Sequence, residues 1–367
     1  FGYLLLWVVL AANLVAMLVQ TQSAKLGIAT GRNLAELCRE RFSRRTSIGL
    51  WLQAELVAMA TDVAEVVGAA LGLNLLFGIP LFPAGLIAGG GAFAILALQQ
   101  FGFRRLEAGI TALVGVVVAS FVVELFHAKP AAGEVAKHLV LPGFSGSESI
   151  LLATGIVGAT VMPHVVYLHS ALTQRRIVGR DEAEKKRILG FEKVDVVIAL
   201  SLAGLVNLSM MIVAAALFNT SGLTGIDTIE GAFEGLETLV SGNAATIFGI
   251  ALVASGFASS SVGTMAGQVV MQGFIQRRIP IFLRRAITLA PALLVLAIGF
   301  NPTDALVFSQ VVLSFGIPFA LVPLLLIARR RDVMGALANP GWLTAVAGSL
   351  AALIIALNVF LIADLFL

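Results

Sequence analysis

The chain has 367 residues, of which 59% are hydrophobic and only 12% charged, and its formal net charge is +3. A soluble domain carries about 25% charged residues, so this composition excludes an ordinary water-soluble protein and indicates a polytopic membrane protein. The single cysteine, Cys38, excludes an internal disulfide and is expected to be an unreactive thiol in a reducing compartment.

Apolar stretches follow one another along the whole chain, and no soluble domain separates them. About 20 apolar residues cross a bilayer, so the pattern predicts an all-α protein with one transmembrane domain, residues 1–367. The ten predicted spans are 3–22, 48–76, 83–99, 105–127, 149–171, 191–218, 243–272, 285–300, 303–328 and 342–366. Short amphipathic helices are expected in loops near 33–42 and 229–240.

Basic residues gather in alternate loops between these spans. Of the 24 Lys and Arg residues, only Lys129 and Lys137 lie in the other set of loops. Because basic loops stay cytoplasmic, the pattern places Phe1 and Leu367 outside. One further span before Phe1 would restore a cytoplasmic N-terminus and give eleven helices. We therefore expect a multi-pass protein of the cytoplasmic membrane, with its native N-terminus inside and its C-terminus outside.

Three acids lie within the second predicted span. Glu55, Asp62 and Glu65 are seven and three residues apart, which places them on one face of a helix. A charge at mid-bilayer costs about 2.5–3.5 kcal/mol, so these carboxylates need water, a cation or ion-pair partners. One interpretation is a structural ion pair with a buried arginine, and the favoured one is a path for protons or cations. Arg284 and Arg285 open the eighth span and either pair with these acids or extend to the cytoplasmic interface.

The fifth predicted span is interrupted near its middle by Pro163. A proline has no amide hydrogen and clashes with the carbonyl four residues earlier, here that of Ala159. In lipid, non-helical backbone survives only where protein or a water-filled cavity covers it, so the break predicts a binding site. Met162 offers a soft thioether, which favours transition metals over Mg²⁺ and Ca²⁺. Packing is the alternative role for Met162, and a hydrogen-bonded core position is the alternative for His164.

Other polar side chains in the spans are weaker candidates. His169 lies five residues beyond His164 and so on a different helical face. Gln310 in the ninth span and Asn207 in the sixth are each interpreted as a neutral ligand or a hydrogen bond between helices. The stretch 255–275 is rich in small residues, which allow helices to approach closely.

Three groups of motifs together carry a family resemblance. They are Ala-Thr-Val-Met-Pro-His at 159–164 with Tyr-Leu-His at 167–169, Gln-Ala-Glu at 53–55 with Thr-Asp-Val-Ala-Glu at 61–65, and Gly-Thr-Met-Ala-Gly-Gln at 263–268 with Gln-Gly-Phe at 272–274. Over essentially its whole length the chain resembles the Nramp family (natural resistance-associated macrophage proteins), in its bacterial manganese-transport branch. This resemblance implies a leucine-transporter-type fold, with two inverted five-helix repeats and broken first and sixth helices.

The resemblance also implies a function. It predicts proton-coupled import of divalent transition metals by alternating access, Mn²⁺ and Fe²⁺ above all, and also Cd²⁺ or Co²⁺. No enzymatic activity and no cofactor are implied, and neither a nucleic acid nor an obligatory protein partner is expected. The alternatives are an organic-substrate carrier of the same fold, such as an amino-acid transporter, and an intramembrane enzyme. Met162 argues against the carrier, because a thioether offers nothing to a carboxylate or an ammonium group.

Site residues follow from the same resemblance. The metal ligands it implies are the thioether of Met162, the carbonyl of Ala159 and, in some states, Gln310. The proton pathway it implies comprises Asp62, Glu65 and His164, a polar network of Glu55, Arg284 and Arg285 towards the cytoplasm, and His169. The family's first helix carries an Asp-Pro-Gly-Asn motif whose Asp and Asn bind the metal, and this motif is absent here. Its absence agrees with the further span that the charge pattern predicts.

Overall fold

The computed structural model describes residues 1–176, 178–219 and 226–366, and within these ranges the regular structure is entirely helical. The helices are α1 (Leu6–Thr30), α2 (Leu34–Arg41), α3 (Arg44–Phe77), α4 (Leu81–Ala97), α5 (Phe103–Ala128), α6 (Ala132–Val140), α7 (Gly146–Val161), α8 (Pro163–Arg176), α9 (Glu182–Ala214), α10 (Ile229–Leu239), α11 (Gly242–Ile275), α12 (Ile281–Ala297), α13 (Pro302–Ala328), α14 (Arg331–Met334) and α15 (Gly341–Phe366). The predicted all-α fold class is thus confirmed.

Eight helical segments of the described chain are long and apolar enough to cross a membrane, with α7 and α8 counted as one. They are α1, α3, α5, α7 with α8, α9, α11, α13 and α15. Helices α4 and α12 overlap the predicted spans 83–99 and 285–300, but each has only 17 residues. A span needs about 17–25 residues, so these two are at the short limit, and the division into ten spans stays a prediction.

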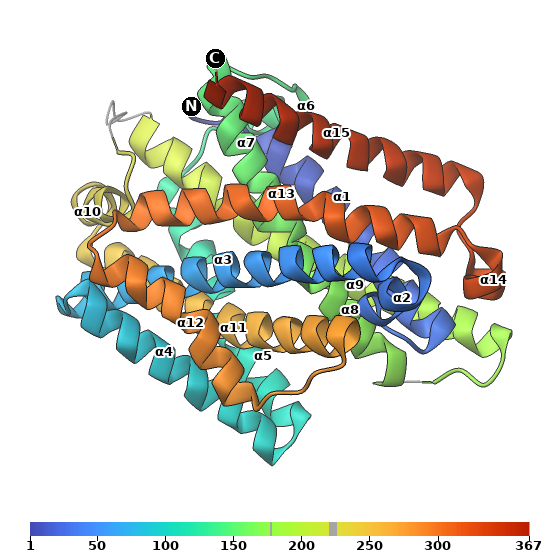
Figure 1. Ribbon diagram of the computed structural model, residues 1–367. Coiled ribbons are helices and arrows are strands. Elements are labelled where there is room, and N and C mark those ends of the chain that lie inside the picture. Colours follow the sequence, from blue (N-terminus) through green and yellow to red (C-terminus); the bar gives the residue numbers. More distant parts are fainter. Residues whose placement is uncertain (177, 220–225, 367) are drawn as a thin grey trace.

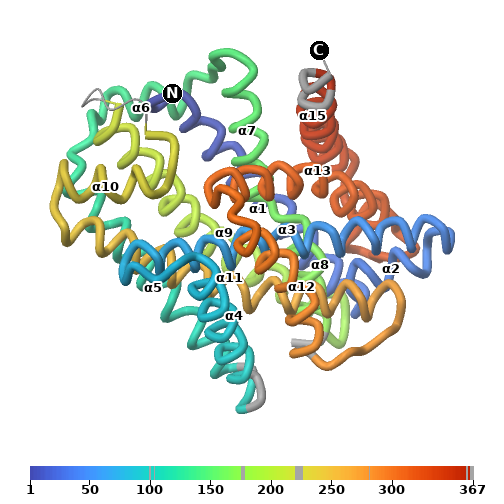
Figure 2. The backbone as a smooth tube through the Cα atoms, turned by 60° about the vertical axis from the view of Figure 1, so that its left-hand side comes forward, coloured from blue at the N-terminus to red at the C-terminus, as the bar shows by residue number. Residues whose placement is uncertain are grey.

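Helix α3 lies at the centre of the bundle. It packs most extensively against α11 and α13 and also contacts α4 and α12. Figure 1 shows α3 between α13 on one side and α11 and α12 on the other. A second group is formed by α1 with α7, α8 and α9. Helix α15 runs along one edge and contacts mainly α13, and it stands at the edge of the bundle in Figure 2 as well.

The first helix is longer than its predicted range of 3–22. It continues to Thr30 and ends at Gly31, whose φ of 67° only glycine adopts readily. Ser23 and Lys25 lie beyond the predicted end and are buried within the protein. Hydropathy alone placed the end too early, because it cannot distinguish polar side chains that face protein from those that face water.

Short helices occupy both predicted loop positions. Helix α2 begins with a capping box, in which Asn33 accepts from the amide of Glu36 and Glu36 accepts from the amide of Asn33. Ser170 of α8 accepts a hydrogen bond from the amide of Leu34, and Arg39 donates to the carbonyl of Gly273. Helix α2 therefore joins the end of α11 to α8.

Candidate functional site

The predicted interruption lies where α7 meets α8. Helix α7 ends at Val161, helix α8 begins at Pro163, and Met162 between them has φ 26° and ψ 97°. A non-glycine residue held at such a sparsely populated backbone angle costs on the order of 1–3 kcal/mol. Pro163 has no amide hydrogen to donate to the carbonyl of Ala159, which thereby loses its ordinary helical bond. The break thus makes both a carbonyl oxygen and a thioether available.

A cavity of about 720 Å³ lies against this break, between α1, α3, α7, α9, α11 and α13. All three residues that the resemblance implies as metal ligands, Ala159, Met162 and Gln310, line it. Ala159 and Met162 lie at the α7–α8 break and Gln310 lies in α13, so the fold brings two distant parts of the chain together. Further polar or sulfur-containing lining residues are Thr61, Glu65, Thr160, Asn207, Met210, Met211, Ser255 and Ser259.

Gln310 presents an open acceptor. Its Nε2 donates to the hydroxyl of Ser309 at 3.2 Å, while its Oε1 is buried and has no hydrogen-bond partner in the described part of the chain. A buried polar atom without a partner costs about 1–3 kcal/mol, which a bound cation would offset. The close approach of α7 to α13 depends on Gly158, because a Cβ there would collide with the backbone carbonyl of Gln310.

Glu65 supplies the one carboxylate among the described residues that line the cavity. Its Oε2 is buried and, within the described ranges, has no hydrogen-bond partner. Gly263 of α11 leaves space for this side chain, because a Cβ on Gly263 would lie only 3.3 Å from Oε2 of Glu65. The resemblance placed Glu65 on a proton path; the structure adds that this carboxylate shares a cavity with Met162.

Asp62 has a different partner. It forms an ion pair with Arg285 of α12, which also donates to the hydroxyl of Ser260. Asp62 is not among the residues that line the cavity. Of the two interpretations drawn from sequence, the structure shows the ion pair with a buried arginine, and the role of Asp62 in proton transfer stays a prediction.

Glu55 lies closer to the N-terminal end of α3 and forms a second ion pair between α3 and α12. Arg284 donates to both carboxylate oxygens of Glu55, at 3.1 and 2.5 Å, and the indole of Trp51 donates to the same carboxylate at 3.0 Å. A Cβ on Gly267 would overlap the guanidinium of Arg284. The small residues in the stretch 255–275 therefore make room for these charged groups as well as for helix packing.

The two histidines of α8 have different surroundings. Nδ1 of His164 lies 3.2 Å from the hydroxyl of Thr61, a residue that lines the cavity. His169 has other neighbours. Its Nδ1 lies 2.9 Å from Oε1 of Gln20 in α1, and its Nε2 lies 2.9 Å from Oε1 of Glu192 in α9. His169 thus belongs to a cluster between α1, α8 and α9, apart from the acids of α3. No pattern in the sequence indicates Glu192 as its partner.

Two further sulfur atoms in the cavity were not predicted from the sequence. Met210 and Met211 of α9 line it together with Met162 and with Asn207, which had been a candidate. The adjacent pair of methionines in the sixth predicted span was the available signal. A methionine in an apolar span usually packs against its neighbours, so the pair alone did not indicate a ligand.

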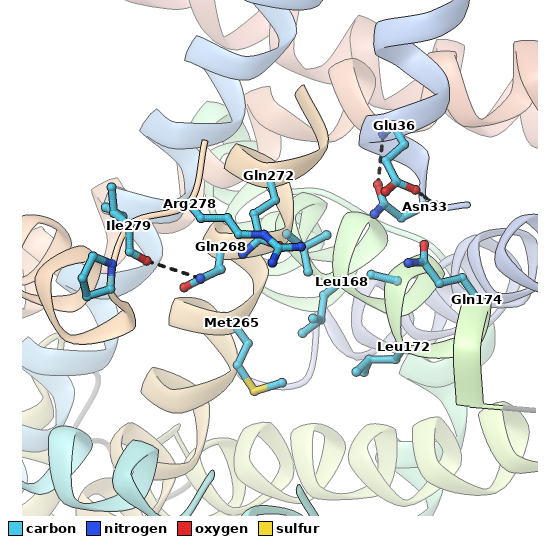
Figure 3. Close-up of a pocket in the computed structure, with 13 residues that line it drawn as sticks. Asn33, Glu36, Leu168, Leu172, Gln174, Met265, Gln268, Gln272, Arg278 and Ile279 are labelled. Atoms are coloured by element: carbon cyan, nitrogen blue, oxygen red, sulfur yellow. Dashed lines mark hydrogen bonds between the residues drawn. The ribbon is translucent and has the colours of Figure 1, made fainter. Parts of the chain in front are cut away.

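A second cavity of about 590 Å³ opens between α2, α8, α11 and the segment 276–280. Figure 3 shows Gln174 and Gln268 on different sides of it, with Arg278 and Glu36 also at its wall. Gln268 donates to the carbonyl of Ile279 at 3.4 Å. In the described chain, Oε1 of Gln174 and Oε1 of Gln268 are buried without hydrogen-bond partners, so the wall is polar and suited to water.

Comparisons with known proteins agree on one family. The model of natural resistance-associated macrophage protein-like sequences matches residues 1–364. The chain is 56% identical over 366 residues to a divalent metal cation transporter MntH of Bacillus subtilis, covering 100% of this chain and 86% of that protein. It is 49% identical over 365 residues to the MntH of Deinococcus radiodurans, covering 100% of this chain and 84% of that one.

Solved structures give the same result. A manganese transporter of Eremococcus coleocola, crystallised with an aromatic bis-isothiourea compound, superposes with a TM-score of 0.89 at 34% identity. The match covers 99% of this chain and 81% of that chain. Mhp1, a nucleobase-cation-symport-1 family transporter, is 18% identical with a TM-score of 0.61 over 98% of this chain and 80% of its own. The last similarity concerns the fold alone and agrees with the leucine-transporter-type architecture that the sequence resemblance implies.

Proposed function

Because this chain belongs to the Nramp family of multi-pass membrane transporters and is not an enzyme, we propose that it imports divalent transition metal ions by proton symport. The proposed substrates are Mn²⁺ and Fe²⁺ above all, with Cd²⁺ or Co²⁺ also accepted. The proposed location is the cytoplasmic membrane, with the basic loops inside and the C-terminus outside. Alternating access would expose the cavity at the α7–α8 break to each side in turn.

The observation that carries this proposal is the convergence of three donors on one cavity. Met162 with its thioether, Ala159 with its freed carbonyl and Gln310 with its unpartnered Oε1 all line it, from the α7–α8 break and from α13. A mixed sulfur and oxygen set suits transition metals, whereas Mg²⁺ and Ca²⁺ require oxygen alone. An amino-acid carrier would instead need groups that pair with an ammonium and a carboxylate.

The proposed proton path starts at Glu65 beside the metal cavity. It continues along α3 to Asp62 with its partner Arg285, and then to Glu55 with its partner Arg284. His164 reaches the cavity wall through its contact with Thr61. Acids inside a membrane are costly, and rows of them on one helix are typical of proton relays. His169 stands apart from this row, and its proposed contribution is through its contact with Glu192.

Metal uptake into proteoliposomes tests the metal site, with Met210→Ala as the matched control. Met162 and Met210 line the same cavity, but only Met162 lies at the helix break. We expect Met162→Ala to reduce Cd²⁺ uptake by about tenfold and to weaken discrimination against Ca²⁺, since the soft ligand is lost. Met210→Ala should leave both near wild-type values. Equal effects of the two substitutions would contradict a ligand role for Met162.

A further inference from the structure

A groove of about 260 Å³ runs between α13 and α15, on the side of α13 away from the metal cavity's lining. Its wall includes Val322 and Leu326 from α13 and Gly348 and Ile355 from α15, with Arg329 at one end. The wall is therefore apolar except at that end, where Thr344 also contributes. Figure 1 shows the two helices joined through α14 beside this charged end.

The groove opens towards the surroundings of the protein. Val322 and Leu326 are each 37% exposed and Ile355 is 39% exposed. Only 22% of the apolar window of α15 is buried, so most of this helix faces outwards. For a protein that spans a membrane, such surface at this depth meets acyl chains and not water.

The charged end of the groove lies at the depth of lipid headgroups. Arg329 is exposed and directly follows the last residue of α13. Trp342, in the first turn of α15, is 68% exposed, and tryptophans at the ends of spans sit at the membrane–water interface. Within the described ranges Arg329 has no carboxylate partner, whereas Arg330 pairs with Asp332 at 2.8 Å.

The length of the groove matches one leaflet. From Thr344 to Ile355 the helix rises about 16 Å at 1.5 Å per residue. The hydrocarbon core of a bilayer is about 30 Å thick, so one leaflet contributes about 15 Å. An acyl chain that starts at the level of Arg329 would end near the membrane midplane.

We propose that this groove binds an anionic phospholipid, with one acyl chain between α13 and α15 and its phosphate on Arg329. The open apolar wall accommodates the chain, and the Arg329 guanidinium, which has no carboxylate partner among the described residues, donates hydrogen bonds to the phosphate. A neighbouring helix of a second copy would cover the apolar wall equally well, but it would leave the charge of Arg329 uncompensated. The charge therefore favours lipid over a protein partner.

Gly348 provides a way to close the groove without disturbing the protein. A Cβ built on this residue meets no atom within 4 Å. Gly348→Leu should therefore place its side chain in the groove and exclude the acyl chain. Ala352 is exposed and lines the same groove, so Ala352→Leu serves as a second variant of the same kind.

Native mass spectrometry of the purified protein tests the proposal. The detergent-solubilised chain is mixed with equal amounts of dioleoyl phosphatidylglycerol and dioleoyl phosphatidylcholine, and the lipids retained on it are counted. We expect about a fivefold preference for one phosphatidylglycerol, as one arginine at a lipid surface gives. Arg329→Gln should abolish the preference, and Arg330→Gln, whose arginine is already paired with Asp332, should keep it. Gly348→Leu and Ala352→Leu should lower retention of both lipids.

Several results would overturn the proposal. Equal losses in Arg329→Gln and Arg330→Gln would mean that diffuse surface charge attracts the lipid. Unchanged retention in both groove-filling variants would show that no acyl chain lies in the groove. Displacement of the lipid by sn-glycerol 3-phosphate would show that the headgroup binds without its chains. A lipid-free dimer that Gly348→Leu dissociates would assign the groove to a second copy.

Discussion

Arg285 and Asp62 form an ion pair in which the two side chains are 0% and 2% exposed. The pair links α12 to α3, and Ser260 of α11 accepts a further hydrogen bond from the same guanidinium. Three helices are thus held together by one buried cation. Such a pair is costly to break, because the remaining charge is left unpaired.

Asp62→Asn separates the structural role of this pair from a role in proton transfer. The amide keeps an oxygen that accepts from Arg285, so only part of the stabilisation by the ion pair is lost, but it carries no titratable proton. We expect metal-stimulated acidification of proteoliposomes, followed with a pH-sensitive dye, to fall sharply while the protein still elutes as the folded species. Arg285→Gln should destabilise the protein by about 3–5 kcal/mol, because it leaves the carboxylate unpaired. The double variant should recover much of that stability but none of the proton flux. Normal proton flux in Asp62→Asn would restrict Asp62 to a structural role.

Gly158→Ala should damage the metal cavity without removing any ligand. The added Cβ would collide with the carbonyl of Gln310 and push α7 away from α13, at a cost of about 1–3 kcal/mol. Gly155→Ala is the matched control, since its Cβ would lie 4.0 Å from Cβ of Gln310, an ordinary contact. Isothermal titration with Cd²⁺ should show weaker binding for Gly158→Ala alone. Similar affinities in the two variants would contradict this account of the helix approach.

Asn339 should stabilise the protein through Lys25. The ammonium of Lys25 is buried and donates to Oδ1 of Asn339, in the segment that links α14 to α15. Asn339→Leu removes the acceptor and should cost about 1–3 kcal/mol of unfolding free energy. Asn339→Asp keeps an acceptor and adds an opposite charge, so it should retain stability. Thermal unfolding in detergent measures both, and equal melting temperatures for the two variants would argue against this contact.

Cys38 should resist labelling in the folded protein. The thiol is 0% exposed, and burial raises the pKa of Cys38 above its ordinary range, so the reactive thiolate is disfavoured. Maleimide should therefore react only on unfolding. The unfolded thiol ionises near pH 8.5, so this group's contribution to stability is complete below that pH and is lost as pH rises above it. Cys38→Ala should remove that part of the alkaline pH dependence. Rapid labelling of the folded protein at neutral pH would contradict the buried position.

Local chemistry made part of this structure predictable. Pro163 fixed the break between α7 and α8, because a missing amide and a steric clash act regardless of the surroundings. The helix near 33–42 was expected from its amphipathic pattern, and the capping box of Asn33 and Glu36 that begins it is equally local, with two hydrogen bonds within one turn. Long apolar runs indicated the membrane helices for the same reason, since burial in lipid depends mainly on side-chain composition.

Partners across the fold were not predictable from periodicity. Glu55, Asp62 and Glu65 share one helical face, yet the first two pair with successive arginines of α12 while Glu65 faces the cavity. A helical face spans a wide arc, and what it meets depends on where α11 and α12 pack. The pairing of His169 with Glu192 was missed for the same reason, because no local pattern joins α8 to α9.

Helices α7 and α8 are joined by a single residue, Met162. The φ and ψ angles of Met162 therefore set the direction of α8 relative to α7. The same residue carries the proposed thioether ligand, so the joint between the helices and the metal ligand are one residue. An ion held by this sulfur would also restrict the joint, and its departure would release it. Binding of the proposed metal ion and the angle between the two helices would thus be linked through the backbone of one residue.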